Sequence, residues 1–565
     1  MSASPSASDS TVAASSSTTG ANPTAPLLPR NNTTLIKAKV DELKHPGGKT
    51  ALTEDDCYED LGFAWSTRKK WSILVVVFLV QMSMNFNSSV ITGAIPLISE
   101  KYDVSEQVAR VAQMIMLICY AFGCELWAPW SEEFGRRPIL QLSLFLVNIF
   151  QLPCALAGDS LGWLFFGRAM IGLSSAGGSV TLGMVADMWD PDNQQFAVAF
   201  VVLSSVGGST IGAVFAGLIE ENLPLEWNFW IQLIFGGVVQ ILHLFFVPET
   251  RVTCLIDESA KKRRRDAKAG KRAADDLNIY GPNEIKEPRI DMHEFKTIWA
   301  RPAIMLVKEP IVLFLSLLSG FSDALIFTFF EGFKAVYDQY DFTPTQLGWI
   351  FWSVEIGYLL GYASFLPWIY RDRQLQKKDP NVQFLPERRL FWLLFLAPLE
   401  PIFLFAFAWT STGPPIPWQV PTVFAIFIGM ANFAIYHATV DYMIAAYGPY
   451  SASATGGNGF ARDFLAGVAA MYSSPLYSTF DPYPRAYASS ILGCIAVVVA
   501  IPIYVFYWKG PEIRAASAFA QTLEADRVAH KKVRDADLLI PHPEDVLVAH
   551  DESAVAGAGT KYGAI

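Results

Sequence analysis

A series of long apolar segments divides this chain, and no other feature constrains its fold as strongly. Runs such as 71–79, 145–150 and 491–506 lack a regular polar face. That pattern is typical of helices whose solvent is lipid. Hydrophobic residues make up 52% of the 565 residues and charged residues only 17%, which is too apolar for an ordinary soluble protein. We therefore expect one polytopic α-helical membrane protein.

Twelve segments are each long enough to cross about 30 Å of hydrocarbon as a helix. A long polar stretch separates the first six from the last six, so the sequence predicts two six-span bundles. The predicted spans are 71–99, 108–130, 138–157, 161–185, 197–218, 229–247, 311–330, 346–368, 390–409, 420–443, 451–471 and 487–508.

The polar segments set the domain boundaries. Residues 1–67 are rich in Ser, Thr, Ala and Pro and are expected to be a disordered tail without a cleaved signal peptide. The first bundle is predicted over 68–248 and the second over 309–508. A basic loop at 249–308 joins them, and 509–565 form a C-terminal tail.

Lysine and arginine are retained on the cytoplasmic side of membrane proteins, so their distribution predicts orientation. Arg136 and Arg137 follow the second span, and a basic run occupies 261–265. The charged residues of the loop after the fifth span, by contrast, are all acidic. Both tails and the central loop are therefore predicted to be cytoplasmic. The basic run could also indicate nucleic-acid binding. Between two sets of spans, a topology determinant that contacts anionic lipid is the favoured interpretation.

The loop between the second and third spans carries a charged motif. Residues 127–138 read Trp-Ala-Pro-Trp-Ser-Glu-Glu-Phe-Gly-Arg-Arg-Pro. A short turn, permitted by Gly135, can aim Arg136 and Arg137 at carboxylates on neighbouring helix ends. The natural partner is Asp187 at the end of the fourth span, and Glu132 is the motif's own acid.

This motif resembles the loop signature of the major facilitator superfamily, in the form used by fungal twelve-span drug:proton antiporters. It departs from the pattern at Ala128, where glycine is usual, and at Glu133, where a base is common. Similar family motifs follow in the expected order at 167–172, 227–230, 248–250, 309–313, 405–409 and 447–453, so the resemblance covers about 66–508.

The resemblance implies an all-α major facilitator fold with pseudo-two-fold symmetry. It also implies a transporter without cofactor, metal or enzymatic activity, in which the charged loop is a conformational latch. The fifth span carries Gly208, Gly212 and Gly217, similar to the family's antiporter motif, but Ala213 stands where proline is normal. These glycines, like Gly172 in the fourth span, are equally explained as close-packing residues.

Ionisable groups inside hydrocarbon cost at least about 2.5–3.5 kcal/mol near a helix centre, so each calls for a reason. Arg168 resembles the family's proton-coupling arginine, and Glu125 is the first choice for the acid beside it. A structural pair is the alternative for every candidate, and Glu400 is expected to be structural. Glu331 is expected to reach water. The remaining candidates for proton coupling are Asp323, Glu355 and His437, the last on one helical face with Asp441.

Polar residues that interrupt the first span are candidates for the substrate cavity. Asn85, Asn87 and Ser88 either line that cavity or bond neighbouring helices.

Three functions remain open at this point. The first is proton-coupled efflux of a drug-like compound, secondary metabolite or organic cation by a monomer, in the plasma membrane or else the vacuolar membrane. The second is import or facilitated diffusion of an organic acid or nutrient. The third is a membrane sensor that binds a ligand without transport.

Overall fold

The computed structural model describes residues 44–520, except 46–48, 176, 190–192, 272–273, 286–291, 379–383 and 518. The chain divides into two compact units, Met1–Ala51 and Leu52–Ile565. In the first unit, strands β1 (Lys44–His45) and β2 (Lys49–Ala51) pair antiparallel. Most of the predicted N-terminal and C-terminal tails lies outside the described residues. All features below belong to the second unit.

The first half of the chain folds into a bundle of long helices. Because hydrocarbon offers no hydrogen-bond partners, each span satisfies its backbone internally as a helix. The Ser66 hydroxyl accepts a hydrogen bond from the Lys69 N–H and caps the first helix. The elements are α2 (Thr67–Ser89), η3 (Val90–Ala94), α3 (Ile95–Tyr102), α4 (Glu106–Ala109), α5 (Val111–Phe134), α6 (Arg136–Ala155), α7 (Leu161–Ser174), α8 (Gly177–Met188), α9 (Gln195–Asn222) and α10 (Glu226–Phe246).

The second half forms a matching bundle. Thr343 and Gln346 make a reciprocal capping box at the start of α15. The elements are α14 (Pro310–Tyr337), η5 (Asp338–Tyr340), α15 (Pro344–Ile350), α16 (Trp352–Lys378), η6 (Pro386–Leu390), α17 (Leu393–Leu396), α18 (Leu399–Thr410), α19 (Gln419–Tyr447), η7 (Gly448–Tyr450), α20 (Ser451–Ser478) and α21 (Pro484–Ala516).

All twelve predicted spans are found as helices. Among the described residues, ten helical stretches are long and apolar enough to cross a membrane by length and composition. The other two spans are α7 with α8, which are separate helices, and α20, which is rich in small and polar residues and carries Arg462 and Asp463. The predicted all-α fold of two six-span bundles is therefore confirmed.

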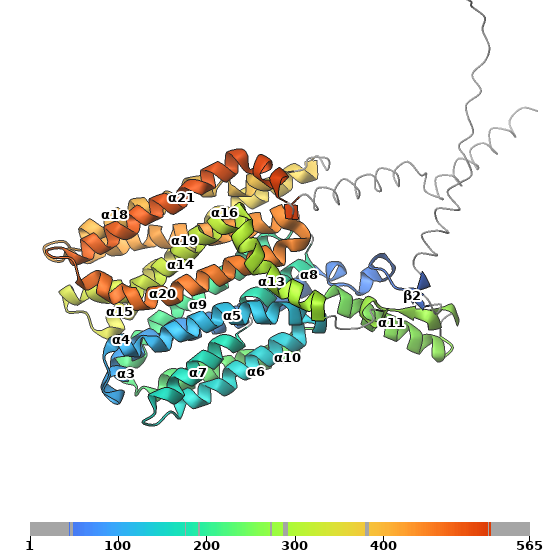
Figure 1. Cartoon of the computed structure of the whole chain (residues 1–565), viewed down its shortest axis with the longest axis horizontal. Coiled ribbons are helices and arrows are strands. Elements are labelled where there is room, and N and C mark those ends of the chain that lie inside the picture. The colour runs from blue at the N-terminus through green and yellow to red at the C-terminus, as the bar shows by residue number, and fades with distance from the viewer. Residues whose placement is uncertain are drawn as a thin grey trace, which may run out of the picture. The chain divides into compact units, whose positions relative to one another are not determined.

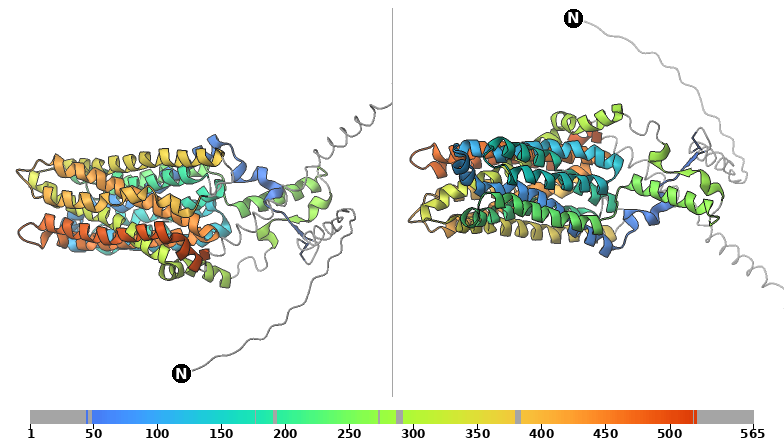
Figure 2. Two further views of the ribbon diagram at one scale, coloured as in Figure 1. Left: turned by 90° about the horizontal axis from the view of Figure 1, so that it is seen from above. Right: turned by 90° about the horizontal axis from the view of Figure 1, so that it is seen from below.

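The two bundles meet along a few helices. In Figure 1, α5 and α20 run side by side where the blue-green bundle meets the orange-red bundle. Figure 2 shows the second bundle in front in its left view and the first bundle in front in its right view. Helix α9 of the first bundle also contacts α15 and α16 of the second. We call the end of the helices that carries α11 the inner end, and the opposite end the outer end.

A small subdomain covers the inner end. It comprises α11 (Val252–Lys268), η4 (Ala274–Asn278), β3 (Ile279–Tyr280), α12 (Pro282–Ile285), η1 (Asp55–Asp60) and η2 (Gly62–Ala64), while α13 (Met292–Lys308) leads into α14. Leu52, Cys57 and Leu61 pack on the apolar side of α11. The sequence assigned residues up to 67 to a disordered tail, but 52–66 are ordered here because these three apolar side chains are buried.

Candidate functional site

A buried arginine stands at the centre of the interface between the bundles. Arg462 on α20 is 3% exposed, and its nitrogens lie 3.7 Å from Asp323 on α14 and 3.5 Å from Asp463. A third approach, 3.5 Å to the Ser205 hydroxyl, crosses to α9 of the other bundle. These separations are long for charge-assisted hydrogen bonds. The arginine is therefore held loosely by partners from both bundles.

Two tyrosines lie near this arginine. Its guanidinium lies 4.0 Å from the ring centre of Tyr436 on α19, a cation–π contact. Tyr120, on α5 of the other bundle, is buried, and its hydroxyl has no hydrogen-bond partner within the described ranges. Nε and Nη1 of Arg462 likewise lack a hydrogen-bond acceptor there. Donors without acceptors in a buried place are typical of a site that can take a ligand.

Glu125 faces the opposite bundle. A β-carbon added to Gly456 on α20 would lie 2.7 Å from Glu125 Oε1. This oxygen is buried and has no hydrogen-bond partner in the described part of the chain. Glu125 thus lies in the inner half of α5, against the backbone of α20.

Glu355 shows the same arrangement from the other side. It is 7% exposed on α16, and a β-carbon on Gly207 of α9 would lie 3.0 Å from its Oε1. Its Oε2 has no hydrogen-bond partner among the residues that can be described. Each bundle therefore presents one carboxylate to a glycine of the other, Glu125 toward the inner end and Glu355 toward the outer end.

Arg168 does not lie beside Glu125 as the sequence suggested. It is fully buried and donates to the backbone carbonyls of Ala112 at 3.1 Å and Asn87 at 3.0 Å. Because those carbonyls belong to α5 and to α2, Arg168 ties helices within one bundle. Only Nη2 lacks a partner among the described residues.

The expected pairing of His437 with Asp441 is also absent from the hydrogen bonds of the described residues. His437 packs between Phe365 and Phe433, with ring centres 4.7 and 5.9 Å away, and its Nδ1 has no partner there. Asp441 instead accepts from Arg389 and, at 3.2 Å, from Gln195. Packing of an imidazole between phenyl rings has replaced the local pair.

The three polar residues of the first span are buried in their own bundle. Asn85 donates to the Gln81 carbonyl, and Ser88 donates to the Asn85 carbonyl. Asn87 is 1% exposed, and its side-chain oxygen has no partner among the described residues. Glu400 accepts from Ser322, which is the structural role expected for it.

The glycine positions all mark close helix contacts. A β-carbon on Gly172 would lie 2.2 Å from the Met116 carbonyl oxygen on α5, and one on Gly208 would lie 2.6 Å from that of Met82 on α2. At Gly212 the same atom would meet the Ser89 hydroxyl at 2.0 Å. Gly217 differs, because a β-carbon there would lie 2.0 Å from the Pro344 carbonyl oxygen of the other bundle.

The charged motif joins three helix ends at the inner side. Arg136 Nε donates to Asp187 at 2.9 Å, and Nη1 donates to the Ser131 hydroxyl at 2.7 Å. Arg137 does not point at a carboxylate with its side chain, which donates to the Leu244 carbonyl. Glu132 contributes its backbone carbonyl, which accepts from Arg251 at 3.2 Å.

Sequence reasoning gave no role to Glu249, which organises this region. One of its oxygens accepts from the backbone N–H groups of Arg136, Thr250 and Arg251, and the other accepts from that of Arg137. The carboxylate thereby satisfies the free N–H groups at the start of α6. Its position in the Pro-Glu-Thr motif after the sixth span was the available signal.

Both ends of the interface are closed. At the inner end Gln195 bonds Asp441, and Arg373 of α16 donates to the Asn193 carbonyl across the bundles. At the outer end Arg110 bonds Glu331 at 2.7 Å. Glu331 was expected to reach water, but this ion pair buries most of its side chain. Between the two ends lie Arg462, Glu125 and Glu355.

Sequence reasoning also missed Arg462 and Asp463, because the span containing them was identified from its small and apolar residues. Two adjacent charged residues inside a predicted span were the signal that could have found them. In the part of the chain that the structure describes, no group of three or more His, Cys, Asp or Glu side chains is arranged to hold a metal ion.

Comparison with known proteins agrees with this architecture. The family model of the Major Facilitator Superfamily matches residues 77–471. The MFS-type transporter acdC of Aspergillus candidus is 30% identical over 80% of this chain and 87% of its own length. The multidrug transporter FLR2 of Candida glabrata is 27% identical over 83% and 78%, respectively.

Among solved structures, the xylose transporter XylE from E. coli, in a partially occluded inward-open conformation, aligns with a TM-score of 0.50. It is 15% identical and covers 78% of this chain and 98% of that one, which shows a shared fold. Members of this family bind small molecules and span the membrane many times. The chain belongs to the major facilitator superfamily of membrane transporters.

Proposed function

We propose that this protein is a proton-coupled exporter of a small organic molecule that works by alternating access between its two bundles. The observation that carries the proposal is the pair of carboxylates Glu125 and Glu355. Each approaches a glycine of the opposite bundle, and each has one buried oxygen without a hydrogen-bond partner among the described residues. Separating the bundles at either end changes the surroundings of one carboxylate.

The physical basis is the free-energy cost of an unpaired charge in a dry interface. A carboxylate closed in without a partner is expected to carry a proton, and it can release that proton when its side of the interface opens to water. Glu125 in the inner half and Glu355 nearer the outer end would then exchange protons with opposite sides. Rocking of the bundles around a central site would then carry protons from one side of the membrane to the other.

The central group around Arg462 is the proposed binding region. Arg462 contributes two nitrogens without a hydrogen-bond acceptor among the described residues, Tyr436 an aromatic face, and Tyr120 of the other bundle a hydroxyl without a hydrogen-bond partner there. Asp323 and Asp463 lie beside them at distances that permit exchange of partners. This combination suits a small organic molecule with an aromatic part and polar substituents. Arg136 and Asp187 are the proposed conformational latch, and the plasma membrane is the proposed location of a monomer.

A facilitator is the second candidate. It is favoured by Ala213, which stands where the antiporter motif has proline, and by Arg168, whose described bonds go to backbone carbonyls instead of an acid. A facilitator would use the same central region without proton exchange.

The experiment compares dye flux through purified protein in proteoliposomes with and without an imposed pH difference. Rhodamine 6G, a fluorescent organic cation, is the probe, and benzoate is the anionic alternative. We expect the pH difference to accelerate flux, and Glu125→Gln or Glu355→Gln to abolish that acceleration while counterflow without a gradient persists. Glu400→Gln is the matched control, because Glu400 is also an acid inside a span but accepts a hydrogen bond from Ser322 within its own bundle.

The outcomes separate the candidates. Flux that ignores both the pH difference and a protonophore would make the protein a facilitator. Coupled flux that survives in both glutamine variants would move the proton site to Asp323 or Asp463. Ligand binding without counterflow of any probe would favour the sensor.

A further inference from the structure

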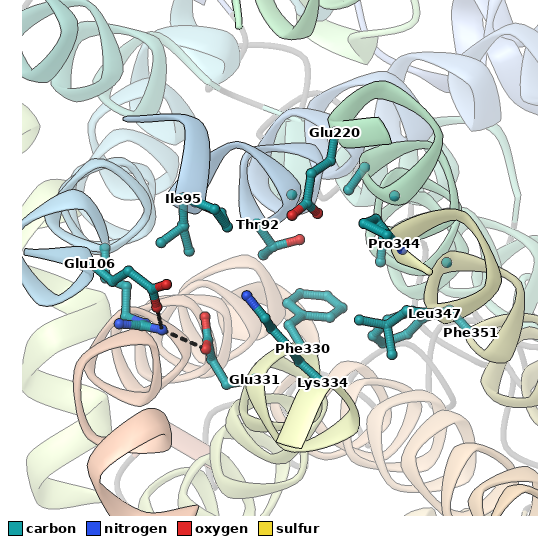
Figure 3. A pocket seen from close by; sticks show the side chains of 17 residues that line it. Thr92, Ile95, Glu106, Glu220, Phe330, Glu331, Lys334, Pro344, Leu347 and Phe351 are labelled. Carbon is teal, nitrogen blue, oxygen red and sulfur yellow. Dashed lines mark hydrogen bonds and ion pairs between the residues drawn. The ribbon is translucent and has the colours of Figure 1, made fainter. Parts of the chain in front are cut away.

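A small pocket lies between the bundles at the outer end. Figure 3 shows its lining, which comes from η3, α3, α4 with the adjoining Arg110, and α9 on one side and from α14, α15 and the adjoining Phe351 on the other. Glu106, Arg110 and Glu220 of the first bundle face Glu331 and Lys334 of the second. The pocket is thus the place where the outer halves of the two bundles meet, and charged groups line it on both sides.

Arg110 is the side chain that links the two walls. It bonds Glu331 at 2.7 Å and Glu106 at 2.9 Å, and only 5% of its side chain is exposed. Glu331 is 12% exposed and Glu106 is 45% exposed. The pair with Glu331 crosses the interface in a dry position, whereas the pair with Glu106 stays within one bundle and faces water. A buried charge-assisted pair of this kind is costly to break on one side only.

Glu106 makes the crossing contact reversible. It precedes Arg110 by one helical turn, so it stays beside the arginine when the second bundle moves away. When the outer end opens, Arg110 therefore loses Glu331 but keeps its ion pair with Glu106. The arginine is not left as an unpaired charge. Glu331 then meets the water that fills the opened mouth.

Two backbone contacts close the same mouth beside the charges. A β-carbon on Gly217 of α9 would lie 2.0 Å from the Pro344 carbonyl oxygen, and one on Gly348 of α15 would lie 2.7 Å from that of Val214. The two helices thus touch through their backbones, and any side chain at Gly217 would push them apart.

We propose that this pocket is the outer mouth of the transport path and that Arg110, shared between Glu331 and Glu106, is its gate. The gate holds the outer halves of the bundles together while the inner side exchanges its contents. Substrate leaves through the mouth when the ion pair between Arg110 and Glu331 breaks. In this role Arg110 is a positioning residue, because it acts by setting the distance between the bundles.

The test measures how accessible the closed mouth is. Ala213, which lines the pocket and is 3% exposed, is replaced by cysteine, and its reaction with a hydrophilic maleimide is timed on the full chain in lipid nanodiscs. The same protein without Ala213→Cys gives the background from the native cysteines. Nanodiscs leave both ends accessible and need no gradient, so the result does not depend on topology or on proton coupling.

We expect Arg110→Gln and Glu331→Gln each to raise the labelling rate about ten-fold, the factor that corresponds to about 1.4 kcal/mol. The double variant should label no faster than either single variant, since both remove one interaction. Lys101→Gln is the matched control. Lys101 bonds Glu226 at 2.6 Å at the same end of the molecule, but both partners belong to the first bundle.

Arg110→Gln and Glu331→Gln each leave one charge of the ion pair without its partner, which could unfold the protein. A second variant therefore tests the same contact without changing any charge. Gly217→Ala introduces no charge and should also accelerate labelling, whereas Gly237→Ala, where a β-carbon meets nothing within 4 Å, should not. Unchanged labelling in Arg110→Gln and Glu331→Gln would overturn the gate. Acceleration of the same size in Lys101→Gln would also overturn it, because any outer charge would then suffice.

Discussion

At the scale of single residues, the turn at Gly135 holds Arg136 between two carboxylates, Asp187 on its side chain and Glu249 on its backbone N–H. The residue types of Gly135, Arg136 and Asp187 predicted a turn that aims a cation at a carboxylate, and the two groups lie 2.9 Å apart. The motif did not reveal that Glu249 accepts four backbone hydrogen bonds beneath that turn. Contacts between distant segments depend on helix packing, which no local pattern encodes.

Gly135 tests this arrangement. Its φ of +101° is unfavourable for other residues, and a β-carbon there would lie within 2.4 Å of Glu249 Oε2. The ψ of Gly135, 154°, places it in a backbone region populated almost only by glycine. We expect Gly135→Ala to destabilise the protein by more than the roughly 1–3 kcal/mol that such a conformation costs, because Glu249 must also move. Gly158→Ala is the control, with a positive φ but nothing within 4 Å. Equal losses of melting temperature in detergent would show that the glutamate contributes nothing.

The latch itself is tested by replacing Arg136 and Arg137 together with alanine. Arg136 bonds Asp187, so its loss frees the end of α8 from the start of α6. We expect probe flux to fall at least several-fold while the protein still reaches the membrane, since these loop cations lie outside the hydrocarbon. Membrane fractionation with a flux assay measures both. Normal flux in a correctly inserted double variant would remove the latch from the account.

At the scale of elements, apolar length was enough to find the spans, but not the tertiary contacts. The breaks between α7 and α8 and between α15 and α16 fall inside predicted continuous spans. Arg168 and His437 lie in the predicted spans but have other partners than expected, because a helical pattern fixes the face of a residue and not the helix that covers it. The sequence did not predict that 52–66 join the inner subdomain, because they follow a long segment rich in Ser, Thr, Ala and Pro.

The contact between α12 and α11 in that subdomain is expected to depend on pH. Burial opposes the charge of Glu284, but hydrogen bonds from Arg264 and the Gly281 N–H outweigh it and lower the pKa of Glu284 below its ordinary value. A carboxyl group with a lowered pKa in the folded state stabilises that state above its unfolded pKa, and this contribution is lost as the pH falls through the folded value. We therefore expect α12 to loosen from α11 below about pH 4.

Hydrogen exchange of the α12 peptide, corrected for the intrinsic effect of pH, measures this loosening. Glu284→Gln should remove the difference between pH 7 and about pH 3, and Glu258→Gln, at an exposed position of α11, should leave it intact. Retention of the full pH difference in Glu284→Gln would mean that another group controls the contact.

At the scale of the whole molecule, the lysine and arginine distribution predicts that α11 and both tails face the cytoplasm. Protease added to the cytoplasmic face of sealed vesicles should therefore cut between α11 and α13, and protease added to the opposite face should not. Cleavage only from that opposite face would invert the orientation and would place the Arg110 gate inside.

Proton-coupled export requires that closing and opening of the two bundles couple proton movement to substrate movement. The most direct measurement follows the lumenal pH of proteoliposomes with trapped pyranine while rhodamine 6G or benzoate is added outside and its uptake is recorded. An antiporter that lets a compound in must let protons out, so we predict that the lumen becomes more alkaline in step with uptake, and that Glu125→Gln and Glu355→Gln suppress the pH change. Uptake with no pH change, or with acidification of the lumen, would contradict the claim.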